Sequence, residues 1–263
     1  MPPSLLLDVQ ITLMALALVM PRVAVCLVIL PGFGAGTLTG LLRGAVAMAL
    51  ALPAVPSTMA LLGEAPPGFL LAAALAGKEV LVGAMLGAIL AIPLWVAQSI
   101  GSILDAQRSP IQIQANNASL DRDASALGGM LVQAMVLVLI EAGLFIAMTR
   151  IIIESYGLWP AYSLTPPFEA GHLDVLIARF GQFMWHVVVY GGPVLIPLLF
   201  IDLAFAMIGV FAPGLQVSFA SSPIKSLAGL LILLVYFPTL AHYAGGDFAR
   251  ILEFPAAMLQ AGP

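Results

Sequence analysis

Long apolar tracts are the feature that most limits what this chain can fold into. A helix needs about 20 consecutive apolar residues to cross a hydrocarbon core roughly 30 Å thick, and several runs here reach that length. Only 8% of the residues are charged, against about 25% in soluble proteins. The sequence therefore predicts an all-α polytopic membrane protein in which residues 1–263 form a single domain. The six predicted helical segments cover residues 9–30, 41–62, 69–103, 126–153, 173–211 and 226–244.

Two of these tracts are longer than a simple membrane crossing requires. A 35-residue helix measures about 52 Å at 1.5 Å per residue. Pro93 interrupts the tract 69–103, and Gly191-Gly192-Pro193 and Pro197 interrupt the tract 173–211. Such residues break or kink helices. Either the two tracts are kinked or hairpin-like, or they project well beyond the bilayer, and both alternatives require burial against protein.

Charged residues also lie inside the apolar tracts. At the centre of a lipid-facing helix, each charge costs about 2.5–3.5 kcal/mol on the insertion scale. We therefore expect these side chains to face a partner, a cavity or a membrane surface. They are Arg22, Lys78, Glu79, Glu141 and Asp202.

One of these charges begins a lane of small residues. Glu79 is followed at four-residue intervals by Gly83, Gly87 and Ala91, which places all four on one face of a helix. Small residues at this spacing let two helix backbones approach closely. The pattern predicts a helix-packing face.

Signals for enzymatic chemistry are weak. His172, His186 and His242 have no second ligand at a metal-binding spacing. Ser221-Ser222 precedes a proline, which is ordinary chemistry for a helix start. The net charge of -4 is small and dispersed, which argues against a nucleic-acid partner. We expect no enzymatic activity, no cofactor and no metal.

The stretch 104–123 is a polar island between apolar tracts, with both asparagines and five of the 22 charged residues. A solvated loop is one interpretation. An ordered loop buried against protein is the other, because Ile111 and Ile113 alternate with Gln112 and Gln114 as in a segment with one buried side. We favour the ordered loop.

Both ends of this island carry features of defined structure. Gln98, Gly101 or Ser102, and Asp105 lie on one face of the preceding predicted helix. Asp121-Arg122-Asp123 brings carboxylates to the start of the next helix, where negative charge is favourable.

Five motifs follow one another between residues 43 and 230. They are Lys78-Glu79-x-x-x-Gly83-x-x-x-Gly87, Gly101-x-x-x-Asp105-x-Gln107-Arg108, Glu154-Ser155-Tyr156-x-x-Trp159-Pro160, Ala212-Pro213-x-x-Gln216-Val217 and Pro223-Ile224-Lys225. In this order and spacing they resemble the T component of the type III secretion export apparatus. This is the SctT family, which includes YscT and SpaR and is homologous to flagellar FliR. Ser109-Pro110 departs from the family, which usually has glycine after the Gln-Arg pair.

The resemblance implies a structural role in protein export. Family members form a pseudo-helical export-gate assembly with the R and S components, with one T subunit, in the bacterial inner membrane and partly raised toward the periplasm. Unfolded secreted substrates pass through its pore. The U switch component and the inner rod and needle base proteins are further partners that the resemblance implies, together with membrane lipid.

The resemblance also implies roles for particular residues. The loop between the third and fourth tracts lies in the channel of family members and helps to plug it. In this sequence the plug is the 105–123 loop, with Asp105, Gln107, Arg108, Ile111, Gln112, Ile113, Gln114, Asn116 and Asn117. Helix-packing or subunit-interface positions are Glu79, Gly83, Gly87, Gly101, Pro213, Pro223 and Lys225.

Two other interpretations stay open. A flagellar export component would resemble the same family. A small proton-coupled secondary transporter would use Glu79, Glu141 and Asp202 as an ion path, but such transporters are expected to contain internal repeats, and no convincing repeat is visible. The basic residues of the loops leave the orientation of the chain in the membrane open.

Overall fold

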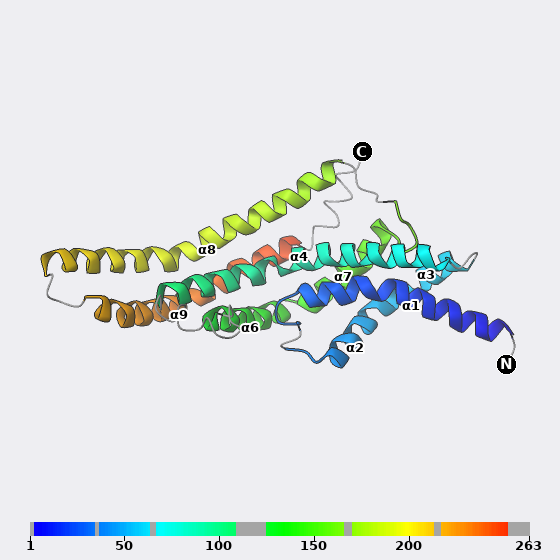
Figure 1. Cartoon of the computed structure of the whole chain (residues 1–263), viewed down its shortest axis with the longest axis horizontal. Coiled ribbons are helices and arrows are strands. Elements are labelled where there is room, and N and C mark those ends of the chain that lie inside the picture. Colours follow the sequence, from blue (N-terminus) through cyan, green and yellow to red (C-terminus); the bar gives the residue numbers. More distant parts are fainter. Residues whose placement is uncertain are drawn as a thin grey trace. The chain divides into compact units, whose positions relative to one another are not determined.

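Helices make up all the regular structure that the computed structural model describes (Figure 1), which covers residues 3–34, 37–63, 67–108, 125–165, 170–212 and 217–251. Each predicted tract corresponds to one or more of these helices, so the all-α fold class is confirmed. The helices are α1 (Pro3–Ile29), α2 (Gly40–Ala51), the short 3-10 helix η1 (Leu52–Ala54), α3 (Val55–Leu62), α4 (Phe69–Arg108), α6 (Ala126–Glu141), α7 (Leu144–Leu158), α8 (Ala170–Phe211) and α9 (Val217–Ile251).

Within the described residues, five helices are long and apolar enough to cross a membrane. They belong to α1, α2 with α3, α4, α8 and α9. The pair α6 and α7 passes the same test only if the two helices count as one bent span. The chain is therefore a multi-pass membrane protein by helix length and composition.

The two overlong tracts are continuous helices, and the hairpin interpretation of them is wrong. α4 has 40 residues and runs through Pro93, and α8 has 42 residues and runs through Pro193 and Pro197. Each proline removes one backbone hydrogen bond from the helix, and the remaining bonds keep the helix intact. At 1.5 Å per residue both helices measure about 60 Å, twice the thickness of the hydrocarbon core.

The tract 126–153 contains a sharp bend that its sequence pattern did not predict. α6 and α7 meet at an angle of 76°. Gly143 lies at the bend with a φ of +95°, a left-handed conformation that only glycine adopts readily. This residue therefore ends one helix and redirects the chain into the next.

The chain divides into two compact units. The first unit contains Met1–Ile92, Ile140–Arg179 and Phe248–Pro263, and the second contains Pro93–Leu139 and Phe180–Asp247. The division passes through α4 at Pro93.

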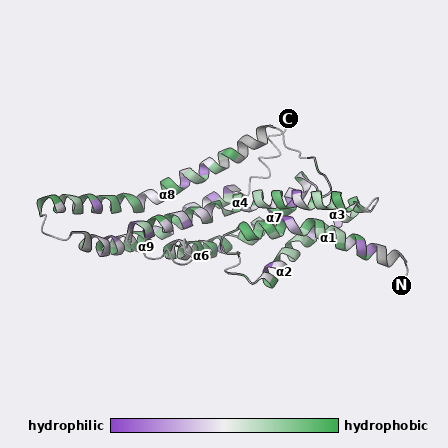
Figure 2. Ribbon diagram, in the orientation of Figure 1, coloured by the Kyte–Doolittle hydropathy of each residue, from purple (hydrophilic) through white to green (hydrophobic). Residues whose placement is uncertain are grey.

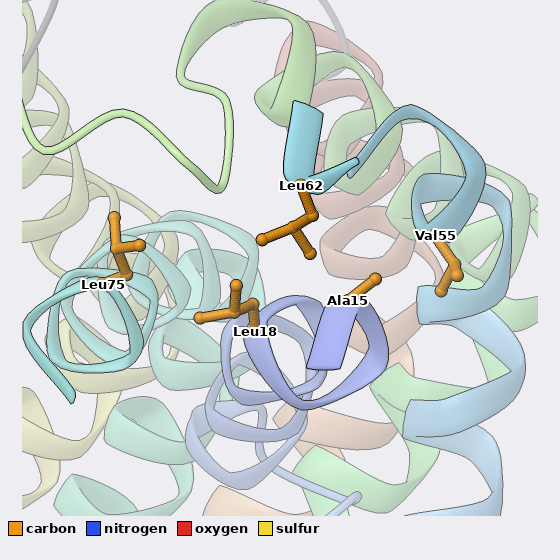
Figure 3. Close-up of a cluster of buried hydrophobic side chains, with 5 residues drawn as sticks. All are labelled: Ala15, Leu18, Val55, Leu62 and Leu75. Carbon is orange, nitrogen blue, oxygen red and sulfur yellow. The ribbon is translucent and has the colours of Figure 1, made fainter. Parts of the chain in front are cut away.

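In the first unit, α1 packs against α2, α3 and the first part of α4. Figure 3 shows side chains from α1, α3 and α4 converging on one another in a small apolar core. Burial of each large aliphatic side chain contributes about 1.5–3 kcal/mol. The core consists of Ala15, Leu18, Val55, Leu62 and Leu75.

In the second unit, α8 and α9 run antiparallel. Tyr190 contacts Tyr243, and Asp202 contacts Lys225, so later residues of α8 meet earlier residues of α9. Only 11% of the best apolar window of α8 and 17% of that of α9 is buried, against 61% for α4. Figure 2 shows hydrophobic residues along nearly the whole C-terminal half of α8. These two helices present their apolar surface outward, whereas α4 is an interior helix.

Two glycines of α4 lie in direct contact with α1. A Cβ atom added to Gly83 would collide with the backbone carbonyl of Arg22, and one added to Gly87 would lie 3.0 Å from the Cα of Cys26. Both positions therefore require glycine if the two backbones are to keep this separation.

Replacing Gly83 with alanine tests this contact, with Gly77→Ala as the matched control. Both glycines lie inside α4, but a Cβ at Gly77 would meet nothing within 4 Å. Gly77→Ala should stabilise the protein by about 0.5–1 kcal/mol through helix propensity. Gly83→Ala should destabilise it by about 1–3 kcal/mol because overpacking forces the helices apart. Thermal unfolding of the solubilised protein measures both effects, and a Gly83→Ala variant as stable as Gly77→Ala would contradict the close approach.

Candidate functional site

A buried ion pair joins α1 to α4 inside the first unit. The Arg22 guanidinium donates hydrogen bonds to both Glu79 carboxylate oxygens, at 2.6 Å and 2.8 Å. Both side chains are completely buried. This two-pronged geometry is the strongest form of an arginine–carboxylate contact.

The remaining donors of Arg22 reach α7 and the turn after it. One nitrogen donates to the Ser155 hydroxyl at 2.9 Å, and another donates to the Trp159 carbonyl oxygen at 2.9 Å. The guanidinium also lies over the ring of Tyr156, 4.0 Å from its centroid, where the π system favours a cation. Arg22 thus connects three helices.

Lys78 ties the turn after α7 to α4. Its ammonium group donates to the carbonyl oxygens of Pro160, Ala161 and Ser163, at 2.8–3.1 Å. It also lies 2.7 Å from a Glu79 carboxylate oxygen. Arg22 and Lys78 therefore share the single negative charge of Glu79. The partial negative charges of the backbone carbonyl oxygens stabilise the second positive charge.

This cluster of Arg22, Lys78 and Glu79 is a structural anchor by its geometry. Among the described residues, no buried side-chain nitrogen or oxygen lacks a hydrogen-bond partner. A buried charge is tolerated when partners of this quality surround it. The contacts of Arg22 with Ser155, Tyr156 and Trp159 were not predicted from the sequence. There these three residues were identified only as part of a family motif. No local pattern pairs them with Arg22, more than 130 residues away.

Removing the central carboxylate should unfold the anchor. Glu79→Gln leaves the buried Arg22 and Lys78 charges without a counter-charge and turns one acceptor oxygen into an NH2 donor, which should destabilise the protein by about 3–5 kcal/mol. Glu154→Gln is the control, because Glu154 pairs with Arg150 on the exposed face of α7, where ion pairs contribute little. Thermal unfolding should separate the two variants by many degrees. Equal melting temperatures would contradict the anchor.

A second polar site lies in the second unit, where the end of α4 meets the start of α6. One Asp105 carboxylate oxygen accepts hydrogen bonds from the Ser125 hydroxyl at 2.6 Å and from the Leu127 backbone N–H at 2.9 Å. The Ser125 hydroxyl oxygen in turn accepts the Gly128 N–H at 2.8 Å. Ser125 therefore caps α6, and Asp105 satisfies a further free N–H of its first turn. We call these contacts the Asp105 clasp.

Glycines make the clasp possible. A Cβ atom on Gly101 would lie 2.5 Å from the Cα of Gly128, and one on Gly128 would lie 3.0 Å from the Gln98 carbonyl oxygen. The backbones of α4 and α6 are thus in contact one turn before Asp105.

Only some of the other predicted channel-loop residues lie in the part of the chain that the structure describes. Gln107 and Arg108 lie in the last turn of α4. The rest, together with Asp121-Arg122-Asp123, lie outside the described residues. They are Ile111, Gln112, Ile113, Gln114, Asn116 and Asn117.

The remaining predicted positions lie mainly in α9. Pro223 and Lys225 lie near its start, whereas Pro213 lies outside the described residues. The Lys225 ammonium is 2.6 Å from an Asp202 carboxylate oxygen on α8. Glu141, the last residue of α6, is exposed.

Comparison with known proteins identifies relatives along nearly the whole chain. Residues 13–251 match the family described as bacterial export proteins, family 1. The Yop proteins translocation protein T of Yersinia pestis is 30% identical over 255 residues, which cover 95% of this chain and 96% of the relative.

More distant relatives come from both secretion and flagellar systems. The surface presentation of antigens protein SpaR of Salmonella typhimurium is 30% identical over 223 residues, 84% of this chain and 82% of that protein. The flagellar biosynthetic protein FliR of Caulobacter vibrioides is 25% identical over 239 residues, 90% of this chain and 94% of that protein. The resemblance drawn from the sequence motifs is confirmed: the chain belongs to the bacterial export protein family 1, with the type III secretion T components YscT and SpaR and flagellar FliR among its homologues.

Proposed function

We propose that this chain is a structural and gating subunit of a type III secretion export channel in the bacterial inner membrane. One copy joins the R and S components in a hetero-oligomeric core, and unfolded substrates pass through the central pore. The 105–123 loop plugs this pore when it is closed. The family match runs through both compact units, which supports treating residues 1–263 as one export-apparatus domain.

The Asp105 clasp is the observation that carries the plug proposal. It joins the last turn of α4 to the first turn of α6, so the polar segment between them leaves and returns to the protein at one place. The clasp fixes the two ends of this segment relative to each other. Fixed ends support a loop that is held at a defined position, as a plug requires.

Exposed apolar surface supports the assignment of partners. α8 and α9 are largely uncovered, and α8 is about twice as long as a bilayer core is thick. Lipid cannot cover the whole length of such a helix. R and S subunits, the U switch component and the inner rod and needle base proteins are the partners we propose for the remainder, with part of the chain raised toward the periplasm.

Ion pairing of the intramembrane carboxylates argues against the transporter alternative. Glu79 is held by Arg22 and Lys78, and Asp202 is held by Lys225. A transport path needs carboxylates that exchange protons or ions, whereas both of these carboxylates are ion-paired with lysine or arginine. A transporter would also be stable alone after purification, whereas an export subunit should require R and S.

A flagellar role is the second candidate, because FliR is among the relatives. The identity to the Yop proteins translocation protein T is higher than that to FliR, 30% against 25%, which favours the secretion branch. Deleting the gene distinguishes the two: loss of effector secretion with normal motility supports the secretion role, and loss of motility supports the flagellar one.

Shortening the loop tests the plug directly. Replacing residues 110–118 with a Gly-Ser linker should leave the clasp and the assembly of the complex intact. The closed pore should then leak ions, because the polar segment that fills it is gone. Conductance of membranes that contain the assembled complex measures the leak. An assembled variant that leaks no more than the parent would show that the loop is not the plug.

Substitution of Asp105 tests the clasp separately from the loop. Asp105→Ala removes a carboxylate that accepts two hydrogen bonds, each contributing about 1.5–3 kcal/mol to the local structure when the acceptor is charged. Asp105→Asn is the matched control, because it keeps one side-chain oxygen in the place where both bonds are accepted but loses the negative charge. We expect the leak to increase in the order parent, Asn, Ala at equal amounts of assembled complex. Equal conductance of all three proteins would mean that the clasp does not position the plug.

A further inference from the structure

A group of ionisable and aromatic side chains lies between α8 and α9, apart from the anchor and the clasp. Nδ1 of His186 is 3.3 Å from a carboxylate oxygen of Asp247, and the Tyr190 hydroxyl donates a hydrogen bond to the same oxygen. The ring of Tyr190 stacks on His186 and on Tyr243, with centroid separations of 5.0 Å and 5.7 Å. His186 and Tyr190 of α8 thus both contact the same carboxylate oxygen of Asp247 on α9.

Few titratable residues lie on the other helices of this unit. The α4 segment Pro93–Arg108 contains Asp105 and Arg108 in its last turn, and the α6 segment Ala126–Leu139 contains none. On α9 the nearest charged residue in sequence is Arg250, one turn beyond Asp247, and His242 lies beside Tyr243 with its ring 6.0 Å away. Histidine and aspartate are costly inside an apolar helix pair and usually have a function there.

The pair lies toward one end of an apolar stretch of the α8–α9 hairpin. The side chains of His186 and Asp247 are 20% and 13% exposed, so most of their surface is covered within the chain. An ion pair between the same helices, Asp202 with Lys225, is sixteen residues further along α8, about 24 Å at 1.5 Å per residue. Since this is close to the thickness of the hydrocarbon core, the two pairs bracket an apolar stretch and lie toward its opposite ends.

We propose that His186, Asp247 and Tyr190 form a proton-binding site that controls how firmly α8 and α9 hold together at this end of the hairpin. When His186 is neutral, its Nδ1 lies 3.3 Å from the Asp247 carboxylate with no charge to attract it. When His186 binds a proton, the resulting imidazolium adds direct charge attraction to the carboxylate at the same distance. Tyr190 keeps the carboxylate in place in both states. This site is independent of the proposed plug, because it uses no residue of the clasp or the loop.

A double-mutant cycle on the full chain in its solubilised membrane complex tests the site. His186→Gln and Asp247→Asn are made singly and together, and unfolding is measured at about pH 5.5 and about pH 8, on either side of the usual histidine range. At the lower pH the two positions should be coupled by about fivefold or more in the folding equilibrium. At the higher pH the coupling should fall to less than half of that value. Additive effects at both pH values, or equal coupling at both, would overturn the proposal.

A single substitution gives a second measurement if Asp247→Asn fails to fold. The difference in melting temperature between the two pH values should shrink in His186→Gln relative to the parent. His242→Gln is the matched control, a histidine of α9 that is exposed, and it should keep the parent's difference. If His186→Gln keeps the full difference, or His242→Gln loses as much, the proton site is not at His186.

Discussion

The burial of the Arg22–Glu79 ion pair is the constraint on which the first unit depends. In a chain with so few charges, two fully buried ionised side chains are stable only if every donor has an acceptor. Those acceptors come from α4, α7 and the turn that follows α7. Three helices are therefore fixed relative to one another by one guanidinium. Gly83, one turn after Glu79, contacts the backbone of Arg22 itself, so helix separation and ion-pair geometry depend on the same contact.

α4 uses the same arrangement a second time in the second unit. There Gly101 contacts the backbone of Gly128, and Asp105, four residues later, accepts hydrogen bonds from the start of α6. In each unit a glycine of α4 allows close approach, and a carboxylate one turn away holds the neighbouring helix. This repetition explains why α4 is the most buried of the candidate membrane spans among the described residues: its glycines and carboxylates are directed at neighbours within the chain.

Much of the fold was predictable from local patterns, because apolar length and small-residue spacing act over a few turns. The helical tracts and the lane that contains Glu79 and Gly83 were identified in this way. Contacts between residues far apart in sequence were not predictable. Ser155 and Trp159 receive the donors of Arg22, and no pattern at either end indicates this. The bend at Gly143 was also missed, since glycine inside an apolar tract is as often a packing residue as a break.

The candidate site shows the same limit at the start of α6. Its sequence suggested that Asp121-Arg122-Asp123 would supply the negative charge there, and these residues lie outside the described part of the chain. The carboxylate that the structure does show at this helix start is Asp105, contributed by α4. Local helix rules thus identified the kind of group that suits this helix start, and α4 supplies one such group because α4 and α6 are in backbone contact.

The proposed position of the 105–123 loop in a protein-conducting pore is tested most directly by photocrosslinking. A photoreactive amino acid at Gln112 in the assembled complex, with an export substrate arrested in the channel, should form a covalent adduct with that substrate. The same amino acid at Val188, an exposed apolar residue of α8, should form none. Adducts to substrate from Gln112 alone would support the account. Adducts from Gln112 to lipid and never to substrate would contradict it.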